Sequence, residues 1–206
     1  MGGALAALVI AGVACGAGSD EGPSTVHGYR EMCKKPRAFS KAAPYARSGP
    51  RPVFVSDFWP TRDSYPDPLG TVDRGTWAPE KPGKVQLVAC VDHIGQGEYL
   101  TTCDYRGLQG SGIGGTGGDE GFVVYYYKGK YKVTVYEART GKRRGSTTVQ
   151  GDIINPSYDR PRECPGMAAQ PKRSSDNERE GDPSTDQLYE ALAPFVTGRA
   201  GAGSGS

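Results

Sequence analysis

Five cysteines are the residues of this 206-residue chain whose number most constrains their chemistry. They are Cys15, Cys33, Cys90, Cys103 and Cys164. Disulfides consume cysteines in pairs, so an odd count in an exported protein leaves one cysteine to be explained separately. The chain has no C-x-x-C spacing, the usual signature of a zinc site or a dithiol redox motif. The cysteines therefore indicate one modified residue and two disulfides.

The amino terminus indicates export. Residues 1–14 (MGGALAALVIAGVA) carry no charged side chain and are too short for a transmembrane helix, which needs about 20 apolar residues. They match the apolar region of a secretory signal, which spans about 7–15 residues and ends in small side chains. No Lys or Arg precedes this stretch, so the true start codon could lie upstream. An ordinary secretory signal cut near Ala14 or Ala17 is the alternative to the interpretation that follows.

Cys15 directly follows the apolar stretch, within Gly12-Val13-Ala14-Cys15-Gly16. This arrangement resembles the lipobox of bacterial lipoproteins, although Gly12 stands where Leu is usual. The resemblance implies that Cys15 receives a thioether-linked diacylglycerol and anchors the protein outside the cytoplasmic membrane. A single acyl chain holds a protein only marginally, which is why a second chain matters. Residues 15–27, including His27, would then form a flexible tether.

The other four cysteines allow three connectivities. Residues 85–94 and 99–106 are rich in β-branched and apolar side chains, and they predict a hairpin whose two-residue loop is Gln96-Gly97. In that register Cys90 lies opposite Cys103 at a non-hydrogen-bonded site, where the two Cβ atoms approach closely enough for a bridge. The predicted pairs are Cys90–Cys103 and, by elimination, Cys33–Cys164.

Candidate catalytic residues are few. Neither His93 nor His27 belongs to an H-x-x-x-H pair, the pattern of zinc hydrolases, so no metal site is predicted. His93 could act as the base of a secreted hydrolase with a remote serine, although no G-x-S-x-G elbow accompanies it. Paired carboxylates for glycoside hydrolysis or for calcium could come from Asp57, Asp63, Asp67 and Asp73. A partly exposed strand histidine and solvated loop acids are the simpler interpretations.

The glycine-rich stretch 107–121 contains Gly110-Ser111-Gly112-Ile113-Gly114-Gly115, a match to G-x-G-x-x-G. The dinucleotide motif needs a helix directly after it, so that the helix amino terminus can hold the pyrophosphate. The residues that follow, TGGDEG at 116–121, cannot open a stable helix. The stretch therefore predicts a loop, and no cofactor is predicted.

One binding surface is suggested by tyrosines beside lysines. Residues 122–127 and 131–136 predict a second hairpin around Lys128-Gly129-Lys130. Tyrosine faces beside a basic rim could contact an anionic wall polymer or lipid headgroups. The candidate residues are Tyr125, Tyr127, Lys128, Lys130 and Lys132. Tyrosine is also common in ordinary strands, and lysine commonly protects sheet edges.

The elements that position these residues are mostly strands. Residues 52–59 predict a first strand, and Trp77 is expected to anchor the Pro-rich loop 60–84 to the core. After the two hairpins, a turn at Thr140-Gly141 and a strand over 143–150 complete an antiparallel meander. The sequence thus predicts a mainly β, sandwich-like domain with long irregular arms.

The carboxyl end predicts a short helix. Ser184 and Gln187 have the spacing of a capping box, and Leu188, Leu192 and Phe195 share one helical face. Pro194 is expected to limit this helix to about two turns. The domain boundaries are then 28–198, with the core at about 85–151 and a disordered tail at 199–206.

Composition narrows the class of partner. The formal net charge is +2, which gives no case for nucleic-acid binding. Hydrophobic residues are 36% and the 31 Gly and 16 Pro make about 23% of the chain, which together predict a modest core.

Several short fragments together resemble a group of small exported lipoproteins of high-GC Gram-positive bacteria. They are Gly49-Pro50-Arg51-Pro52-Val53, residues 85–90 (VQLVAC), residues 136–142 (YEARTGK), Cys164-Pro165 and residues 192–196. The resemblance implies location and cysteine pairing, but no activity. The predicted function is a non-enzymatic envelope protein that is held at the membrane by its lipid and binds an envelope protein or wall polymer. The alternatives are the secreted hydrolase and a passive structural or stress lipoprotein.

Overall fold

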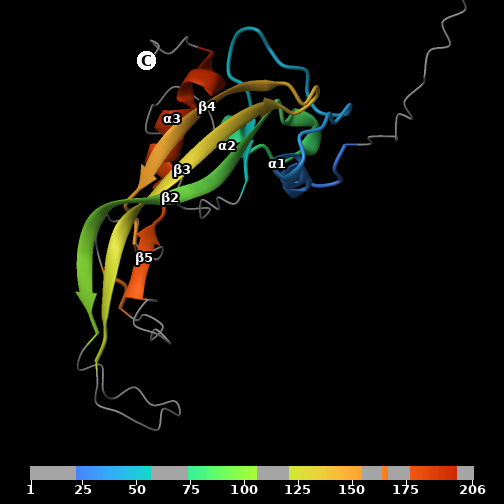
Figure 1. The fold of residues 1–206 in the computed structure, drawn as a ribbon. Coiled ribbons are helices and arrows are strands. Elements are labelled where there is room, and N and C mark those ends of the chain that lie inside the picture. Colours follow the sequence, from blue (N-terminus) through green and yellow to red (C-terminus); the bar gives the residue numbers. More distant parts are fainter. Residues whose placement is uncertain (1–21, 57–73, 106–120, 155–163, 167–176, 199–206) are drawn as a thin grey trace, which may run out of the picture.

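The chain is described by a computed structural model over residues 22–56, 74–105, 121–154, 164–166 and 177–198. This part is a five-stranded sheet with several short helical turns and one longer helix at the carboxyl end (Figure 1). The mainly β class, the carboxyl-terminal helix and the presence of two disulfides are confirmed. The strands are β1 (Val53–Val55), β2 (Leu87–Asp104), β3 (Val123–Glu137), β4 (Arg143–Gly151) and β5 (Glu178–Gly181). The helices are α1 (Glu31–Lys34), α2 (Arg74–Trp77) and α3 (Thr185–Thr197), with 3-10 turns η1 (Val26–Arg30) and η2 (Pro82–Lys84).

The sheet is mixed, and β3 lies at its centre. β2 pairs antiparallel along one edge of β3. Two strands share the other edge: β4 pairs antiparallel with residues 129–136 and β5 pairs parallel with residues 125–128. β1 adds to the free edge of β2 in parallel. The antiparallel part of the sheet is therefore the β2–β3–β4 meander, and the two short strands extend it with parallel pairs that the sequence did not predict.

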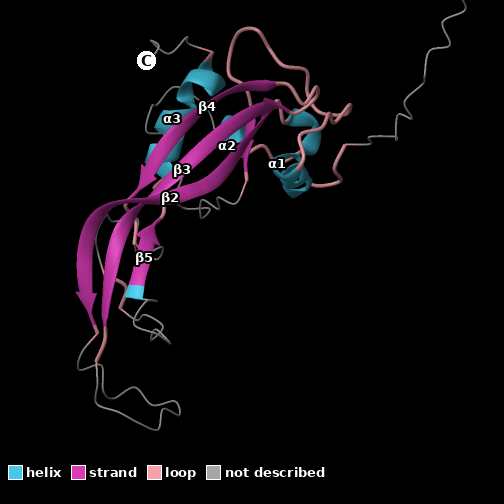
Figure 2. Cartoon of the chain, viewed as in Figure 1, coloured by secondary structure: helices cyan, strands magenta, loops and turns pink. Residues whose placement is uncertain are grey.

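Alternating side chains build a separate core on each face of the sheet. On one face, Leu87 of β2 and Val133 of β3 pack against Leu192 of α3, and all three are fully buried. On the other face, Val88 packs in a cluster with Tyr29 from the amino-terminal segment. Helix α3 covers the half of the sheet that contains β4, whereas β5 joins the other half (Figure 2).

Several local predictions are confirmed. Trp77 is buried in the core beneath α3, with its ring centroid 4.5 Å from that of Tyr189. The predicted strand 143–150 lies within β4, and Gly141 makes the turn before it with φ +72. The predicted first strand, 52–59, is the shorter β1, and residues 57–59 lie outside the described part.

Helix α3 begins as predicted and ends later than predicted. The Ser184 hydroxyl accepts from the Gln187 amide (3.1 Å), and the Gln187 side chain accepts from the Ser184 amide (2.8 Å), which completes the capping box. The helix continues through Pro194 for 13 residues rather than two turns. Leu192 and Val196 on either side of Pro194 are fully buried against the sheet, and this burial offsets the hydrogen bond that proline removes.

The hairpin predicted around Gln96-Gly97 is wrong, because β2 runs through those residues as one strand of 18 residues. The glycines occur where the register between β2 and β3 shifts, between His93 and Gly95 and between Gln96 and Tyr99. Gly95 has φ +138, a backbone angle that other residues rarely adopt. The glycines therefore absorb bulges within the strand instead of reversing the chain.

The hairpin predicted around residues 128–130 is also wrong. β3 is continuous from Val123 to Glu137, and β2 and β3 together form one long, curved ribbon (Figure 1). Gly129 remains in the strand because its missing side chain leaves room for its neighbours: a Cβ there would lie 2.5 Å from Cε2 of Tyr131. Its role is close approach rather than a turn.

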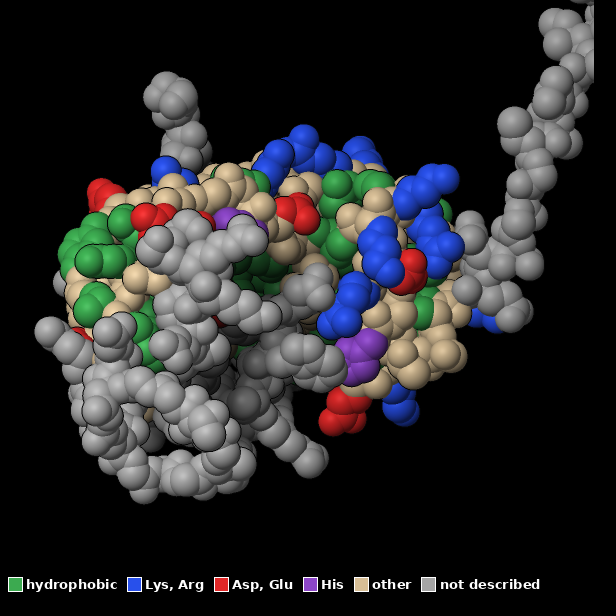
Figure 3. Space-filling model, turned by 60° about the horizontal axis from the view of Figure 1, so that its bottom comes forward, with side chains coloured by type: hydrophobic (Ala, Val, Ile, Leu, Met, Phe, Trp, Pro, Cys, Tyr) green, Lys and Arg blue, Asp and Glu red, His purple; other side chains and the backbone are tan. Residues whose placement is uncertain are grey.

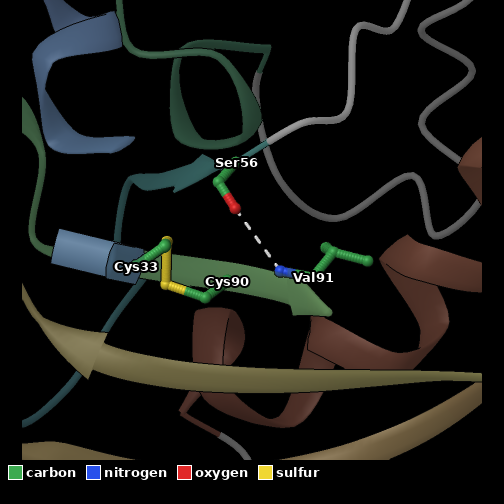
Figure 4. Close-up of a disulfide and its surroundings, with 4 residues drawn as sticks. All are labelled: Cys33, Ser56, Cys90 and Val91. Carbon is green, nitrogen blue, oxygen red and sulfur yellow. Dashed lines mark hydrogen bonds between the residues drawn. A yellow bond between two sulfur atoms is a disulfide. The ribbon is translucent and has the colours of Figure 1, made fainter. Parts of the chain in front are cut away.

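The disulfides are Cys33–Cys90 and Cys103–Cys164, so both predicted pairs are wrong. The predicted pairing required a turn between Cys90 and Cys103, but both lie on the continuous strand β2. Cys90 faces the amino-terminal core and meets Cys33 of α1, with the two Cα atoms 5.3 Å apart (Figure 4). In the same view the Val91 amide donates to the Ser56 hydroxyl (3.4 Å), which ties the end of β1 to β2.

A third cluster fills the far end of the ribbon. Cys103 and Tyr126 lie in it with Leu100 and Ile154, and all four are buried. The Cys103–Cys164 bridge fastens a distant part of the chain to this end of the sheet. Among the described residues, no helix has the length and apolar character needed to span a bilayer.

Candidate functional site

The main polar and aromatic cluster lies on the α3 side of the sheet, beyond the end of the helix. β3 is continuous, so Tyr125, Tyr127 and Tyr131 share the face of Val133, which packs against α3. Their neighbours on β2 are His93, Gln96 and Tyr99, and those on and after β5 are carboxylates. We call the set the tyrosine–carboxylate face: His93, Gln96, Tyr99, Tyr125, Tyr127, Tyr131, Glu178, Glu180 and Asp182.

Two of the four tyrosines of this face are unusually accessible. Tyr99 is 55% exposed and Tyr125 is 42% exposed. The rings of Tyr99 and Tyr127 meet edge to face, with centroids 5.8 Å apart. The Tyr99 hydroxyl also lies 2.5 Å from Oγ1 of Thr102. Such contacts hold the rings in position while leaving ring surface available to a partner.

Each carboxylate is held by a side chain from the ribbon. The side-chain amide of Gln96 donates to the Glu178 carboxylate (3.4 Å), and the Tyr131 hydroxyl donates to Oδ1 of Asp182 (2.8 Å). His93 Nε2 contacts Glu180 across the face. β5 is therefore tied to β3 by backbone pairing and to the ribbon by side chains, which fixes the position of three acids.

Burial and the neighbouring carboxylates raise the pKa of two tyrosines of this face. Burial, and then the Glu178 carboxylate, raise the pKa of Tyr127 above its ordinary value. Burial, followed by the hydrogen bond to Asp182, raises the pKa of Tyr131 well above its ordinary value. A phenol is already neutral at physiological pH, and burial and the neighbouring carboxylates disfavour its ionisation further, so both side chains are hydrogen-bond donors.

Gly129 makes this arrangement possible. A Cβ at this position would clash with the Gly181 carbonyl and with the Tyr131 ring. Without a side chain at Gly129, the Tyr131 ring lies over β3 and its hydroxyl reaches Asp182 just after β5. The requirement for glycine here is one of space, since its φ is not in the left-handed region.

The predicted tyrosine-and-lysine surface is divided by the sheet. Lys128, Lys130 and Lys132 alternate with the tyrosines along β3, so they point to the opposite face. There Lys128 pairs with Glu98 (2.9 Å), and this hydrogen bond and charge lower the pKa of Glu98. The prediction failed because it placed a turn at residues 128–130, where the chain instead keeps the strand period of two.

The hydrolase alternative involved His93. In the described part of the chain His93 contacts the Glu180 carboxylate and the Tyr131 ring, whose centroid is 5.2 Å away. A triad needs a hydroxyl or thiol nucleophile on the imidazole, and these contacts supply only an orienting carboxylate. No three His, Cys, Asp or Glu side chains within that described part are arranged to hold a metal ion.

Some of the predicted site residues belong to segments that the structure does not describe. The lipidation candidate Cys15 and the four aspartates Asp57, Asp63, Asp67 and Asp73 lie outside the described residues. The same is true of residues 107–120 of the glycine-rich stretch.

The carboxylates were missed by sequence reasoning. Glu178 and Glu180 fall in the polar, Pro-rich segment after β4, which belongs to the irregular arms that the sequence predicts. The sequence of β5, EREG, has no β-branched or aromatic residue, so strand propensity gave no signal. Glu137, at the end of β3, is buried and pairs with Arg144 of β4.

Comparisons of the chain with protein-family models, with curated proteins and with solved structures find no match. The chemistry of the face therefore rests on its own geometry. Exposed tyrosine rings attract cations over their faces, and fixed carboxylates accept hydrogen bonds from ammonium or guanidinium groups. The arrangement suits a cationic ligand.

Proposed function

We propose that the protein is a lipid-anchored binding module outside the bacterial cytoplasmic membrane, whose tyrosine–carboxylate face binds a cationic segment of another envelope protein. One observation supports the location: four of the five cysteines are consumed by two disulfides, which leaves Cys15 as the odd one. Disulfides persist in oxidising compartments outside the cytoplasm. Cys15 is also the residue that the lipobox-like sequence marks for acylation, and the resemblance to exported lipoproteins supports the same location.

The chemistry of the partner follows from the sign of the charge. The face carries Glu178, Glu180 and Asp182, and its tyrosines are separated from the lysines of β3 by the sheet. An anionic wall polymer would meet carboxylates there, which is unfavourable. A segment rich in Arg or Lys would gain both ion pairs and cation–π contacts. Of the two partners considered from the sequence, an envelope protein is the better match.

The location is tested by the intact mass of the protein extracted from membranes. We expect a chain that begins at Cys15, carries a diacylglyceryl adduct and is four hydrogens lighter than the fully reduced chain. A soluble chain that retains residues 1–14 would refute the location. A Cys15→Ser variant should carry no diacylglyceryl adduct.

The binding face is tested with two synthetic peptides of equal length, one rich in Lys and Arg and one rich in Asp and Glu. We expect the full chain to bind the cationic peptide, and Glu178→Gln with Glu180→Gln to weaken that binding about tenfold, as the loss of two ion pairs and their support of the tyrosines implies. The matched control is Asp186→Asn with Glu190→Gln, which removes the same charge from exposed positions on α3. Equal losses in the two variants, or preference for the acidic peptide, would refute the proposal.

A further inference from the structure

The near-neutral net charge of the chain conceals a strong separation of charge along the sequence. Residues 22–56 contain seven Lys or Arg and one acid, residues 137–144 contain four and one, and residues 80–84 contain two and one. These three segments hold 13 basic and 3 acidic residues, a net charge of +10, whereas the whole chain has +2. All the rest of the chain therefore carries −8.

The three basic segments lie together in the fold. The Phe39 amide donates to the Ala138 carbonyl (3.0 Å), which joins the amino-terminal segment to the turn before β4. The Ala43 amide donates to the Val85 carbonyl (3.1 Å), which joins the same segment to η2. A Cβ at Gly141 would contact the backbone of Arg37. The segments thus form one surface, which we call the basic end.

Most cations of the basic end are exposed to solvent. Its exposed Lys and Arg residues are Lys34, Lys35, Arg37, Lys41, Arg47, Lys81, Lys84, Arg139, Lys142, Arg143 and Arg144. Of its acids, Glu31 is paired with Lys34, and Glu137 is buried against Arg144. Figure 3 shows Lys and Arg side chains gathered on one side of the domain. The surface therefore presents a large excess of positive charge.

The basic end is also the part of the domain nearest in the chain to the lipidation site. The described chain begins at Gly22, where a Cβ would lie 3.1 Å from the Cβ of Lys41. Gly22 lies seven positions after Cys15, and seven chain steps span at most about 25 Å when fully extended. An anchor on Cys15 would therefore hold these cations close to the membrane surface.

We infer that the basic end lies against anionic phospholipid headgroups and orients the anchored domain on the membrane. The inference rests on the proposed function, since the lipid on Cys15 supplies proximity. Basic residues near an anionic bilayer each strengthen binding about fivefold, and the effect fades within a Debye length of roughly 10 Å. The same surface would repel the carboxylates of the tyrosine–carboxylate face if the domain turned that face toward it. Both effects turn the tyrosine–carboxylate face away from the bilayer.

The test uses the full chain with Cys15→Ser, so that binding does not depend on acylation. Its sedimentation is measured with vesicles of phosphatidylglycerol and phosphatidylcholine and with vesicles of phosphatidylcholine alone, which corrects for the apolar residues 1–14. We expect binding that requires phosphatidylglycerol and declines with added salt. Replacing Lys35, Lys41, Lys84 and Lys142 by Gln should weaken it more than tenfold.

A matched variant replaces four cations of β3 and β5, Lys128, Lys130, Lys132 and Arg179, by Gln. We expect this variant to change binding less than threefold, so an equal effect of the two sets would refute the inference. A wild-type readout guards against a variant that fails to fold: anionic vesicles should protect Lys35 and Lys84 from acetylation, but not Lys130. Uniform protection would also refute it.

A binding measurement with soluble poly(glycerol phosphate) distinguishes anionic lipid from an anionic wall polymer as the ligand of the basic end. Equal affinity per phosphate for this polymer and for vesicles would assign the basic end to a wall polymer and overturn the inference. Failure of the proposed function gives a different result, namely no adduct on Cys15 in cells, and it leaves the vesicle measurement unaffected.

Discussion

Removing the two disulfides separately should cost nearly the same stability. The sequence separations are 57 residues for Cys33–Cys90 and 61 residues for Cys103–Cys164. With loops of these lengths, the loss of denatured-state constraint amounts to about 4 kcal/mol for each bridge. Cys90 and Cys103 are both almost fully buried, so replacing each pair by Ala leaves similar environments. For a domain of this size such a loss lowers Tm by about 8–16 °C.

The assay compares three variants in a Cys15→Ser background by chemical denaturation and by thiol titration. The variants are Cys33→Ala with Cys90→Ala, Cys103→Ala with Cys164→Ala, and Cys90→Ala with Cys103→Ala. The first two should each lose about 4 kcal/mol and show no free thiol, because the other bridge stays intact. The third removes one partner from each bridge, so it should lose about 8 kcal/mol and show two free thiols.

The third variant is decisive. If Cys90 and Cys103 were bonded to each other, replacing both would leave one bridge intact, cost only about 3 kcal/mol for the short loop and show no free thiol. That result would refute the continuous strand β2 as well as the pairing, since the alternative requires the chain to reverse between the two residues.

Two further predictions concern the core and the ribbon. Gly129→Ala should lower the free energy of unfolding by about 1–3 kcal/mol, because the new methyl group meets Tyr131 and the Gly181 carbonyl. The control Gly83→Ala should be nearly neutral, since the nearest atom to its new methyl group is 3.8 Å away. Equal stability of the two variants in urea would argue against the path of β5. Burial raises the pKa of Tyr29 to about 12, so the stability that this neutral phenol contributes is complete below pH 10 and is lost as the pH rises from 10 to 12. Tyr29→Phe should abolish that alkaline loss in unfolding free energies measured across this range, and identical alkaline profiles would contradict it.

The elements that the sequence predicted well are those specified by near neighbours. The capping box of Ser184 and Gln187 is a contact between residues three positions apart, and it begins α3 as expected. The turn at Gly141 depends on a single backbone angle. Trp77 is buried because a large aromatic side chain gains most from leaving water, whatever its partners.

The two wrongly predicted hairpins both come from glycine, which occurs in turns and also where two backbones approach closely. Sequence alone does not distinguish these two cases. Gly97 and Gly129 were both interpreted as turn residues. In the structure Gly97 lies in an irregular part of β2, and a Cβ there would be 3.0 Å from the Lys128 carbonyl. Close approach and chain reversal both favour glycine, and only the partner strand decides between them. Each misplaced turn also led to a wrong prediction of which side chains share a face of the sheet.

The candidate site was only half predictable for a similar reason. Tyr125 and Tyr127 stood out because they lie in a run of aromatic and β-branched residues. Glu178 and Glu180 did not, because a strand of four residues forms where the edge of β3 is left open beyond the end of β4. Such pairing is a property of the whole sheet, and local propensity does not reveal it.

In the proposed arrangement, the division of charge would let one small domain bind two different partners. Leu87 and Tyr99 are 12 residues apart on β2, which corresponds to about 40 Å along the strand, several times the Debye length at physiological salt. The cations at one end and the carboxylates on the distal face therefore act nearly independently, despite the overall charge of +2. An anionic surface attracts the first and repels the second, so one electrostatic field both holds the domain and presents its tyrosines outward. Neutralising the basic end should consequently change the orientation of the domain on the membrane without changing the affinity of the tyrosine–carboxylate face for a cationic peptide.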